Sequence, residues 1–161
     1  MKFQTHKDSI DKAVRRIDAI IPHRDMGTML SNLLIAVEAK QVSITASDME
    51  TTARITVPVE SSKTGEFIIP AKQFQEYVGS LVSKDLIVEV ESEENPEDGA
   101  AAFRVNLRGT SDASAAYVMP GNSAKHFPTL NRLSDNKLFA VSSSILEEMI
   151  RKTQYAISQE D

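Results

Sequence analysis

Two segments of this 161-residue chain, 136 positions apart, carry the same order of apolar and basic residues. The matching positions are Phe3 with Phe139, Ile10 with Leu146, Val14 with Ile150, Arg15 with Arg151, Arg16 with Lys152 and Ile21 with Ile157. Any two amphipathic helices share a few such matches by chance, but the order favours a domain-sized repeat that opens with a strand and a helix. Since 161 − 136 leaves 25 residues, we expect one complete repeat and the first strand and helix of a second.

The first segment predicts an amphipathic helix between Asp8, a candidate N-cap, and Ile21. Its apolar residues recur at spacings of three and four, which places them in one stripe. The opposite face carries Lys12, Arg15 and Arg16. A second helix is expected to begin at Pro70, in the N1 position, because apolar residues repeat at helical spacing from Phe74 to Leu81.

Short runs rich in β-branched residues surround these two helices and predict strands. The expected strands are 31–39, 41–47, 51–59, 66–69, 86–91, 101–108 and 114–119. Strands adjacent in sequence and joined by short polar turns favour antiparallel pairing. The pattern therefore predicts an α+β fold, with two helices packed on antiparallel sheets.

The stretch from Gly121 to Asn136 contains proline, glycine and asparagine without periodicity, which indicates a connection between domains. We predict a first domain over 1–128, a linker over 129–136 and a truncated second domain over 137–161. The last part should contain a strand at 137–141 and a helix that runs from a capping box of Ser144 and Glu147 to about Ile157. One strand and one helix cannot bury their apolar stripe alone, so this part is expected to belong to a longer protein or to borrow a partner surface.

The net charge is mildly negative, with 18 Lys and Arg against 23 Asp and Glu, which sum to −5. Any contact with nucleic acid must therefore come from a local basic patch. The chain has no cysteine, which excludes disulfides, thiol catalysis and cysteine-ligated metals. The first residues lack the apolar segment of a signal peptide, and we expect a cytoplasmic protein.

Candidate catalytic residues are scarce. His6, His23 and His126 lie in three separate segments, and their spacing predicts no metal site. The neighbouring acids Asp48 and Glu50 are interpreted as turn residues, because turn carboxylates commonly bond local backbone N–H groups. The serine run 142–144 lacks the pattern of a nucleophile elbow, and helix capping explains it more simply. We therefore expect no enzyme activity, no cofactor and no metal.

The basic face of the first helix has two interpretations. It is either an ordinary solvated surface, partly neutralised by Asp8 and Asp11, or a surface for a phosphate backbone. Arg151 and Lys152 repeat the basic pair in the second segment, and Arg24 adds a cation in the loop after the first helix. This repetition on an acidic chain favours binding to phosphates without base readout.

Several collinear motifs resemble the first domain of the bacterial sliding clamp, the beta subunit of DNA polymerase III. They are the start MKF, the Arg24 loop leading into Ser31-Asn32-Leu33-Leu34, the turn Ser47-Asp48-Met49-Glu50, Ile69-Pro70-Ala71-Lys72 with Phe74, and the stretch from Met119-Pro120 to His126-Phe127-Pro128. Residues 150–157, with Thr153-Gln154-Tyr155, resemble the first helix of the second domain. The resemblance covers essentially the whole chain.

The resemblance implies a DNA-clamp fold and a homodimeric ring whose helices line a hole around double-stranded DNA. Such a ring is a processivity factor without an active site, and it tethers the replicative polymerase by topology. Arg24 matches a DNA-contacting arginine of the family, and Lys12 and Lys72 match basic positions of the helices that line the hole. Arg15 and Arg16 are assigned to the DNA-binding set from helix geometry alone, and Arg151 and Lys152 from the repeat.

The resemblance also implies a dimer contact along the last strand of the first domain. The bulky and basic residues of the family are replaced here by small ones, including Ser114 and Ala116, so Tyr117 and backbone pairing are expected to substitute for them. The pocket for the polymerase and the clamp loader lies in family domains beyond Asp161. The alternative is a non-enzymatic protein-interaction adaptor that presents its basic helix face to an acidic partner.

Overall fold

The computed structural model describes residues 1–22, 29–61, 63–94, 101–111, 116–128 and 140–157, and the chain divides into two compact units, Met1–Leu130 and Asn131–Asp161. The strands of the first unit are β1 (Lys2–His6), β2 (Asn32–Val37), β3 (Gln41–Ser47), β4 (Thr52–Pro58), β5 (Glu60–Ser61), β6 (Gly65–Pro70), β7 (Asp85–Glu94), β8 (Ala101–Gly109) and β9 (Tyr117–Asn122). Its helices are α1 (Lys7–Ile17) and α2 (Ala71–Ser80), with short 3-10 turns at Asp18–Ile20, Met29–Ser31 and Ala124–His126. No helix among these residues is long and apolar enough to cross a membrane.

The strands form one sheet in the order β4-β3-β2-β6-β9-β8-β7-β1-β5, and each pairing among the described residues is antiparallel. The two ends of this order are joined through the chain, because only Val59 separates β4 from β5. The Thr5 hydroxyl on β1 also donates to the carbonyl of Pro58 on β4 at 3.1 Å. The sheet therefore curls around one interior, and it confirms the predicted α+β fold.

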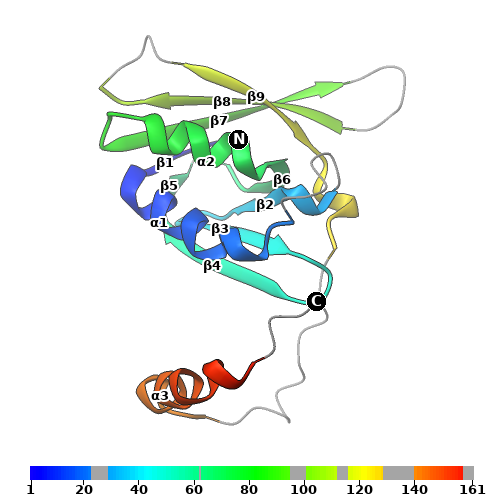
Figure 1. Ribbon diagram of the computed structural model, residues 1–161. Coiled ribbons are helices and arrows are strands. Elements are labelled where there is room, and N and C mark those ends of the chain that lie inside the picture. The colour runs from blue at the N-terminus through cyan, green and yellow to red at the C-terminus, as the bar shows by residue number, and fades with distance from the viewer. Residues whose placement is uncertain (23–28, 62, 95–100, 112–115, 129–139, 158–161) are drawn as a thin grey trace. The chain divides into compact units, whose positions relative to one another are not determined.

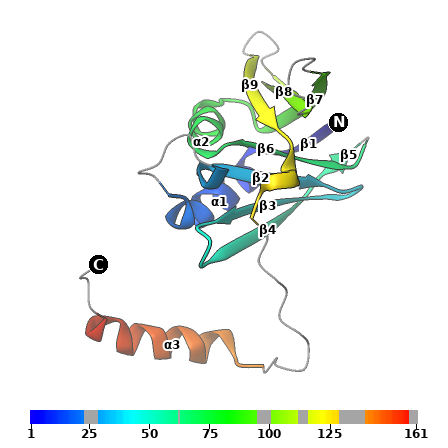
Figure 2. The same ribbon diagram turned by 90° about the vertical axis from the view of Figure 1, so that its right-hand side faces the viewer.

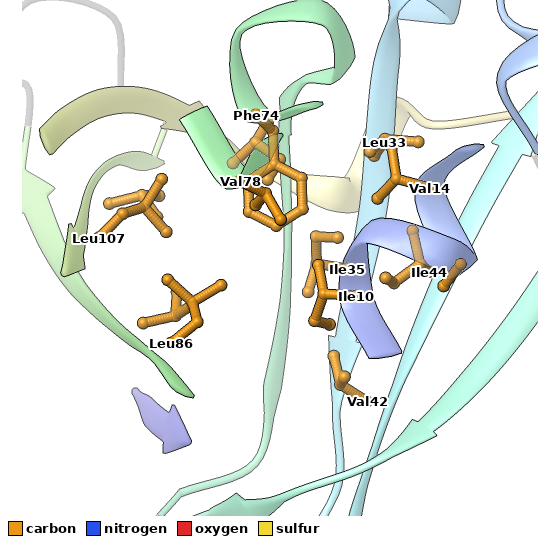
Figure 3. Close-up of a cluster of buried hydrophobic side chains, with 14 of the residues drawn as sticks. Ile10, Val14, Leu33, Ile35, Val42, Ile44, Phe74, Val78, Leu86 and Leu107 are labelled. Carbon is orange, nitrogen blue, oxygen red and sulfur yellow. The ribbon is translucent and has the colours of Figure 1, made fainter. Parts of the chain in front are cut away.

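The helices α1 and α2 lie on the same side of strands β2, β3 and β6 (Figures 1 and 2). Their apolar stripes fill the interior, where Ile10 and Val14 of α1 approach Phe74 and Val78 of α2 (Figure 3). Alternate residues of the strands complete this core, including Leu33 and Ile35 of β2, Val42 and Ile44 of β3, Leu86 of β7 and Leu107 of β8. Burial of these side chains is the main source of stability.

The other face of β2 and β6 carries a smaller apolar cluster. Leu34 and Ile68 point away from the main core, since neighbours in a strand alternate between faces, and Phe127 covers them. The segment after β9 thereby packs on the sheet side opposite to the helices. The motif around Phe127 owes its apolar character to this packing.

Several predicted boundaries were wrong, and local contacts explain why. The helix begins at Lys7 with His6, and not Asp8, in the N-cap position, because β1 continues through His6 and the N–H of Lys7 donates to the carbonyl of Lys84 at 2.8 Å. The α-helix ends at Ile17 instead of Ile21. Pro70 is the N-cap of α2 and not N1, because it still pairs with Asn32 as the last residue of β6.

The last predicted strand of the first domain, 114–119, begins at Tyr117 in the structure, and residues 114 and 115 lie outside the described residues. Asp48 was correctly interpreted as a turn residue. Its Oδ1 accepts from the N–H groups of Glu50 and Thr51.

The second unit is described over residues 140–157 and contains α3 (Ser143–Thr153) and a 3-10 turn at Gln154–Ala156. The capping box of Ser144 and Glu147 was wrong: Ser142 is the N-cap, without a side-chain cap bond, and its hydroxyl instead contacts that of Ser144 at 2.8 Å. Ala140 and Val141 are not in a strand, and the rest of the strand predicted at 137–141 lies outside the described residues. The apolar side chains of α3 are exposed, among them Ile145, Leu146, Met149 and Ile150.

The inner face of α2 provides a direct test of the core. Val78 is fully buried, whereas Val82, just past the helix, is 97% exposed. We expect Val78→Ala to lower the free energy of unfolding by about 1.5–3 kcal/mol, because it removes buried apolar surface and leaves a cavity. Urea unfolding followed by circular dichroism measures the change. Val82→Ala is the matched control and should move the midpoint little; equal losses for the two variants would contradict this placement of α2.

Candidate nucleic-acid interface

The helix α1 carries exposed cations because only one side of it is committed to the core. Ile10, Ala13, Val14 and Ile17 are buried in one stripe, and the side of the helix away from this stripe faces solvent. Lys12 and Arg16 are exposed there, one turn apart. Neither has a hydrogen bond or an ion pair within the part of the chain that the structure describes. The ammonium group of Lys12 and the guanidinium group of Arg16 are therefore available to an external anion.

Arg15 lies differently from its neighbour Arg16. Its Nε donates to Oδ2 of Asp11 at 2.9 Å, one turn earlier on the same helix. Its guanidinium also reaches α2, since a Cβ added to Gly79 would lie 3.8 Å from Nη2 of Arg15. The hydrogen bond and the charge of Asp11 raise the pKa of Arg15 above its usual value. Arg15 therefore lies near Gly79, in the last turn of α2.

Lys7 contacts the end of α2. Its Nζ donates to the carbonyl of Leu81 at 2.7 Å and lies 3.4 Å from that of Gly79. The last turn of α2 contains no basic residue of its own, so Lys7 places a positive charge where the helix dipole is negative. Sequence reasoning missed this residue, and no local pattern signals a contact that spans 74 positions.

Lys72, which the family resemblance placed on this helix, is exposed in the first turn of α2. A cation at this end of a helix is unfavourable by a few tenths of a kcal/mol to about 1 kcal/mol, because the dipole is positive there. No carboxylate occupies that turn to compensate it. Helix stability therefore does not explain a lysine at this position.

The other predicted DNA-binding residues fall into two groups. Arg24 lies outside the described residues. Arg151 and Lys152 are exposed in the last turn of α3, where Lys152 pairs with Glu148 at 2.7 Å. They belong to the second unit, whereas Lys12, Arg16 and Lys72 belong to the first.

The predicted dimer strand is partly described. Ser114 lies outside the described residues, and Ala116 is exposed. Tyr117 is 40% exposed, and its ring stacks on that of Tyr77 with centroids 5.1 Å apart and planes at 22°. Tyr77 in turn donates from its hydroxyl to the carbonyl of Leu107 at 3.0 Å. This aromatic pair, which the sequence did not signal, fastens α2 to β9.

The strand β9 pairs with β8 along its whole length but with β6 only through Ile68 and Asn122. Within the described residues, the first half of β9 thus has one edge without a neighbouring strand. Such an edge can accept a further strand by backbone hydrogen bonds alone. The small side chain of Ala116, the residue before β9, does not prevent this pairing.

Two cations on the strands share one carboxylate as their ion-pair partner. Glu89 on β7 accepts from Lys2 at 2.7 Å and from Arg108 at 2.9 Å. These hydrogen bonds, with that of Lys2 the larger, lower the pKa of Glu89. No cluster of His, Asp and Glu suited to a metal ion occurs within the ranges described above.

Solved structures with the same fold are bacterial clamps. The chain superposes over its full length on a Helicobacter pylori beta clamp bound to a DNA ligase peptide, with a TM-score of 0.84, 19% identity and coverage of 42% of that chain. It also matches the DNA polymerase III subunit beta of Pseudomonas aeruginosa, with a TM-score of 0.81, 24% identity and coverage of 100% and 41%. These likenesses define the fold as that of a DNA clamp.

The family described as DNA polymerase III beta subunit, N-terminal domain, matches residues 1–131, and the chain belongs to this family. It is similar to the beta sliding clamps of Pseudomonas aeruginosa, at 24% identity over 162 residues, and of Synechococcus elongatus, at 26% over 163. Both alignments cover the whole chain but 41% and 40% of the relatives. The chain thus spans about two fifths of the length of these relatives.

Glu89 provides a test by pH. Because its pKa is lowered in the folded state, its contribution to stability is present above the unfolded value of 4.5 and is lost as the pH falls through the lower folded value. We expect Glu89→Gln to lower the melting temperature at pH 7 by the equivalent of less than about 1 kcal/mol, as for other exposed pairs. The difference from the wild type should shrink below pH 4.5. Glu66→Gln on β6 is the control, and a pH-independent difference for Glu89→Gln would contradict the assignment.

Proposed function

We propose that this chain is the first domain and the beginning of the second domain of a DNA sliding clamp. In the full-length ring, this processivity factor encircles duplex DNA and tethers the replicative polymerase. The observation that carries the proposal is the exposure of Lys12, Arg16 and Lys72 on the two helices of a domain of the DNA polymerase III beta subunit family. Arg24, Arg151 and Lys152 complete the proposed DNA-binding set.

The chemistry of this surface suits a protein that slides. Lysine and arginine side chains attract phosphates by charge, and contacts to phosphates carry no sequence information. A protein held in this way moves along the duplex without a preferred site. The remaining acidic surface, within a net charge of −5, repels DNA from other orientations. The proposed function requires no active site, because the ring acts by topology.

The proposed ring has two copies of the longer protein, joined in part through the edge of β9. The small side chain of Ala116 and the stacked ring of Tyr117 suit backbone pairing at this edge, and Ser114 belongs to the same predicted contact. We assign contacts with the replicative polymerase and the clamp loader to domains outside this chain. The cytoplasm, where the bacterial chromosome is replicated, is the expected location.

A protein-interaction adaptor that uses the same basic helix face is not favoured. The relatives and the structures with this fold are named as sliding clamps. An adaptor would bind an acidic protein and ignore duplex DNA at any salt concentration. The two functions are therefore separated by one binding experiment.

DNA binding through this surface should depend on salt concentration. The 161-residue chain should bind a fluorescent 20-base-pair duplex at low salt, measured by anisotropy, with log Kd rising linearly with log salt. Lys12→Ala, Arg16→Ala and Lys72→Ala should each reduce the slope by about 0.9, the value for one phosphate contact. Lys40→Ala, on the turn between β2 and β3, is the control and should leave the slope unchanged. Binding that no helix variant alters would contradict the proposed surface.

A ring that acts by encircling DNA should distinguish circular from linear DNA. In the experiment, residues 1–131 of this chain replace the matching region of the full-length Pseudomonas aeruginosa beta sliding clamp. Size-exclusion chromatography then shows whether this chimera forms a dimer. After loading, the chimera should stay on nicked circular DNA through gel filtration and should leave the same DNA once it is linearised. Lys12→Ala with Arg16→Ala should reduce retention on the circle. Equal retention on circular and linear DNA would exclude the ring mechanism.

A further inference from the structure

Two adjacent arginines of α1 have different surroundings, although the sequence offers them as equivalent DNA contacts. Arg16 extends into solvent without a partner among the described residues, whereas Arg15 is bonded to Asp11 and lies near Gly79 of α2. We propose that Asp11 holds Arg15 as a brace between α1 and α2 and keeps it from the DNA phosphates, so that α1 contacts DNA through Lys12 and Arg16 alone. This proposal rests on the proposed function.

The carboxylate of Asp11 is suited to hold an arginine. Its side chain is only 22% exposed, and Oδ1 is buried without a hydrogen bond from any described residue. Arg15 is therefore its one partner in that part of the chain, bonded through Oδ2. If Arg15 turned to a phosphate, a largely buried carboxylate would lose its counter-charge, which is unfavourable. Arg16 reaches a phosphate without such a loss.

The order of the pair also favours the brace. An acid four residues before a base on a helix has the more stable orientation, since it agrees with the helix dipole. Arg15 is in the last turn of α1, where a cation is stabilised by that helix as well. The guanidinium is still 60% exposed, so it is held by these interactions and not by burial. Removal of the carboxylate should release it.

The brace has a consequence for sliding. Lys7 bonds the end of α2 from the start of α1, and Arg15 approaches the same end from the last turn of α1. Together they fix the two helices and hence the spacing of Lys12 and Arg16 from Lys72. A further free arginine would add a phosphate contact and deepen non-specific affinity. Arg15 is in this view a positioning residue, and Asp11 restrains the affinity of the surface.

The experiment compares salt slopes for the 161-residue chain and a 20-base-pair duplex. We expect Arg15→Gln to leave the slope unchanged and Arg16→Gln to reduce it by about 0.9. Asp11→Asn should raise the slope by about 0.9 because Arg15 becomes available, and the double variant Asp11→Asn with Arg15→Gln should return to the wild-type slope. Asp8→Asn is the matched control: it removes the same charge from an exposed position of α1, so it should strengthen binding at low salt without a new contact.

The signal of the Arg15 Nε–H group in a nitrogen–proton correlation spectrum provides a second readout. It should be unmoved by duplex in the wild type and should shift in Asp11→Asn, while the Arg16 signal should shift in both. Loss of slope in Arg15→Gln equal to that in Arg16→Gln, or the same effect of Asp11→Asn and Asp8→Asn, would overturn the proposal.

The failure of the proposed function has a different signature. In that case the wild-type chain would show no salt-dependent binding at all, and the inference would fall with it. The ion pair itself would still be detectable in urea unfolding, because the stability losses of Asp11→Asn and Arg15→Gln would not add in the double variant. Normal binding with Arg15 in contact with the duplex would instead remove this inference alone. Urea unfolding also shows whether each variant is folded, and Arg15→Gln carries the test if Asp11→Asn is not.

Discussion

Burial of the inner face of the sheet by α1 and α2 is the constraint on which the rest of the structure depends. The sheet turns Leu33, Ile35 and Ile44 to one side, where the apolar stripes of the two helices pack with them in one buried core. A helix that commits one apolar stripe, from Ile10 to Ile17, to this core presents its other side to solvent. Lys12 and Arg16 are exposed on that side. The pattern that builds the core therefore also builds the candidate DNA surface.

The curled sheet imposes a second constraint. Because β4 continues through Val59 into β5, the two ends of the strand order meet, and few strand edges remain. An exposed edge would invite pairing with other chains. Among the described strands, the first half of β9 keeps such an edge beside the stacked rings of Tyr77 and Tyr117. The same stack ties this edge to α2, so the proposed dimer strand and the helix that carries Lys72 are mechanically linked.

The sequence predicted the main elements because their residue content and spacing differ: α2 repeats apolar residues such as Phe74 and Val78 at helical spacing, whereas the strands are rich in β-branched residues. Helical spacing also placed Lys12 and Arg16 opposite the apolar stripe of α1, whereas Lys72 was assigned from the resemblance to the clamp family. It did not predict the start of α1, since a backbone bond from Lys7 to Lys84, far along the chain, replaces a side-chain cap. The contacts of Lys7 with Leu81 and of Tyr77 with Tyr117 likewise join distant segments. Residue type and local spacing do not predict contacts between segments that are distant in the sequence.

Charge on this domain is better understood cation by cation than as a sum. Glu89 pairs with both Lys2 and Arg108 on the strands, Asp11 is bonded to Arg15, and the carbonyl of Leu81 accepts a hydrogen bond from Lys7. What remains free on the described helices of the first unit is a small set, Lys12, Arg16 and Lys72, and the last of these opposes its own helix dipole. A net charge of −5 is thus compatible with a surface that attracts phosphates. Weak attraction by a few cations suits a protein that must hold DNA and still move along it, since each added contact would strengthen non-specific binding.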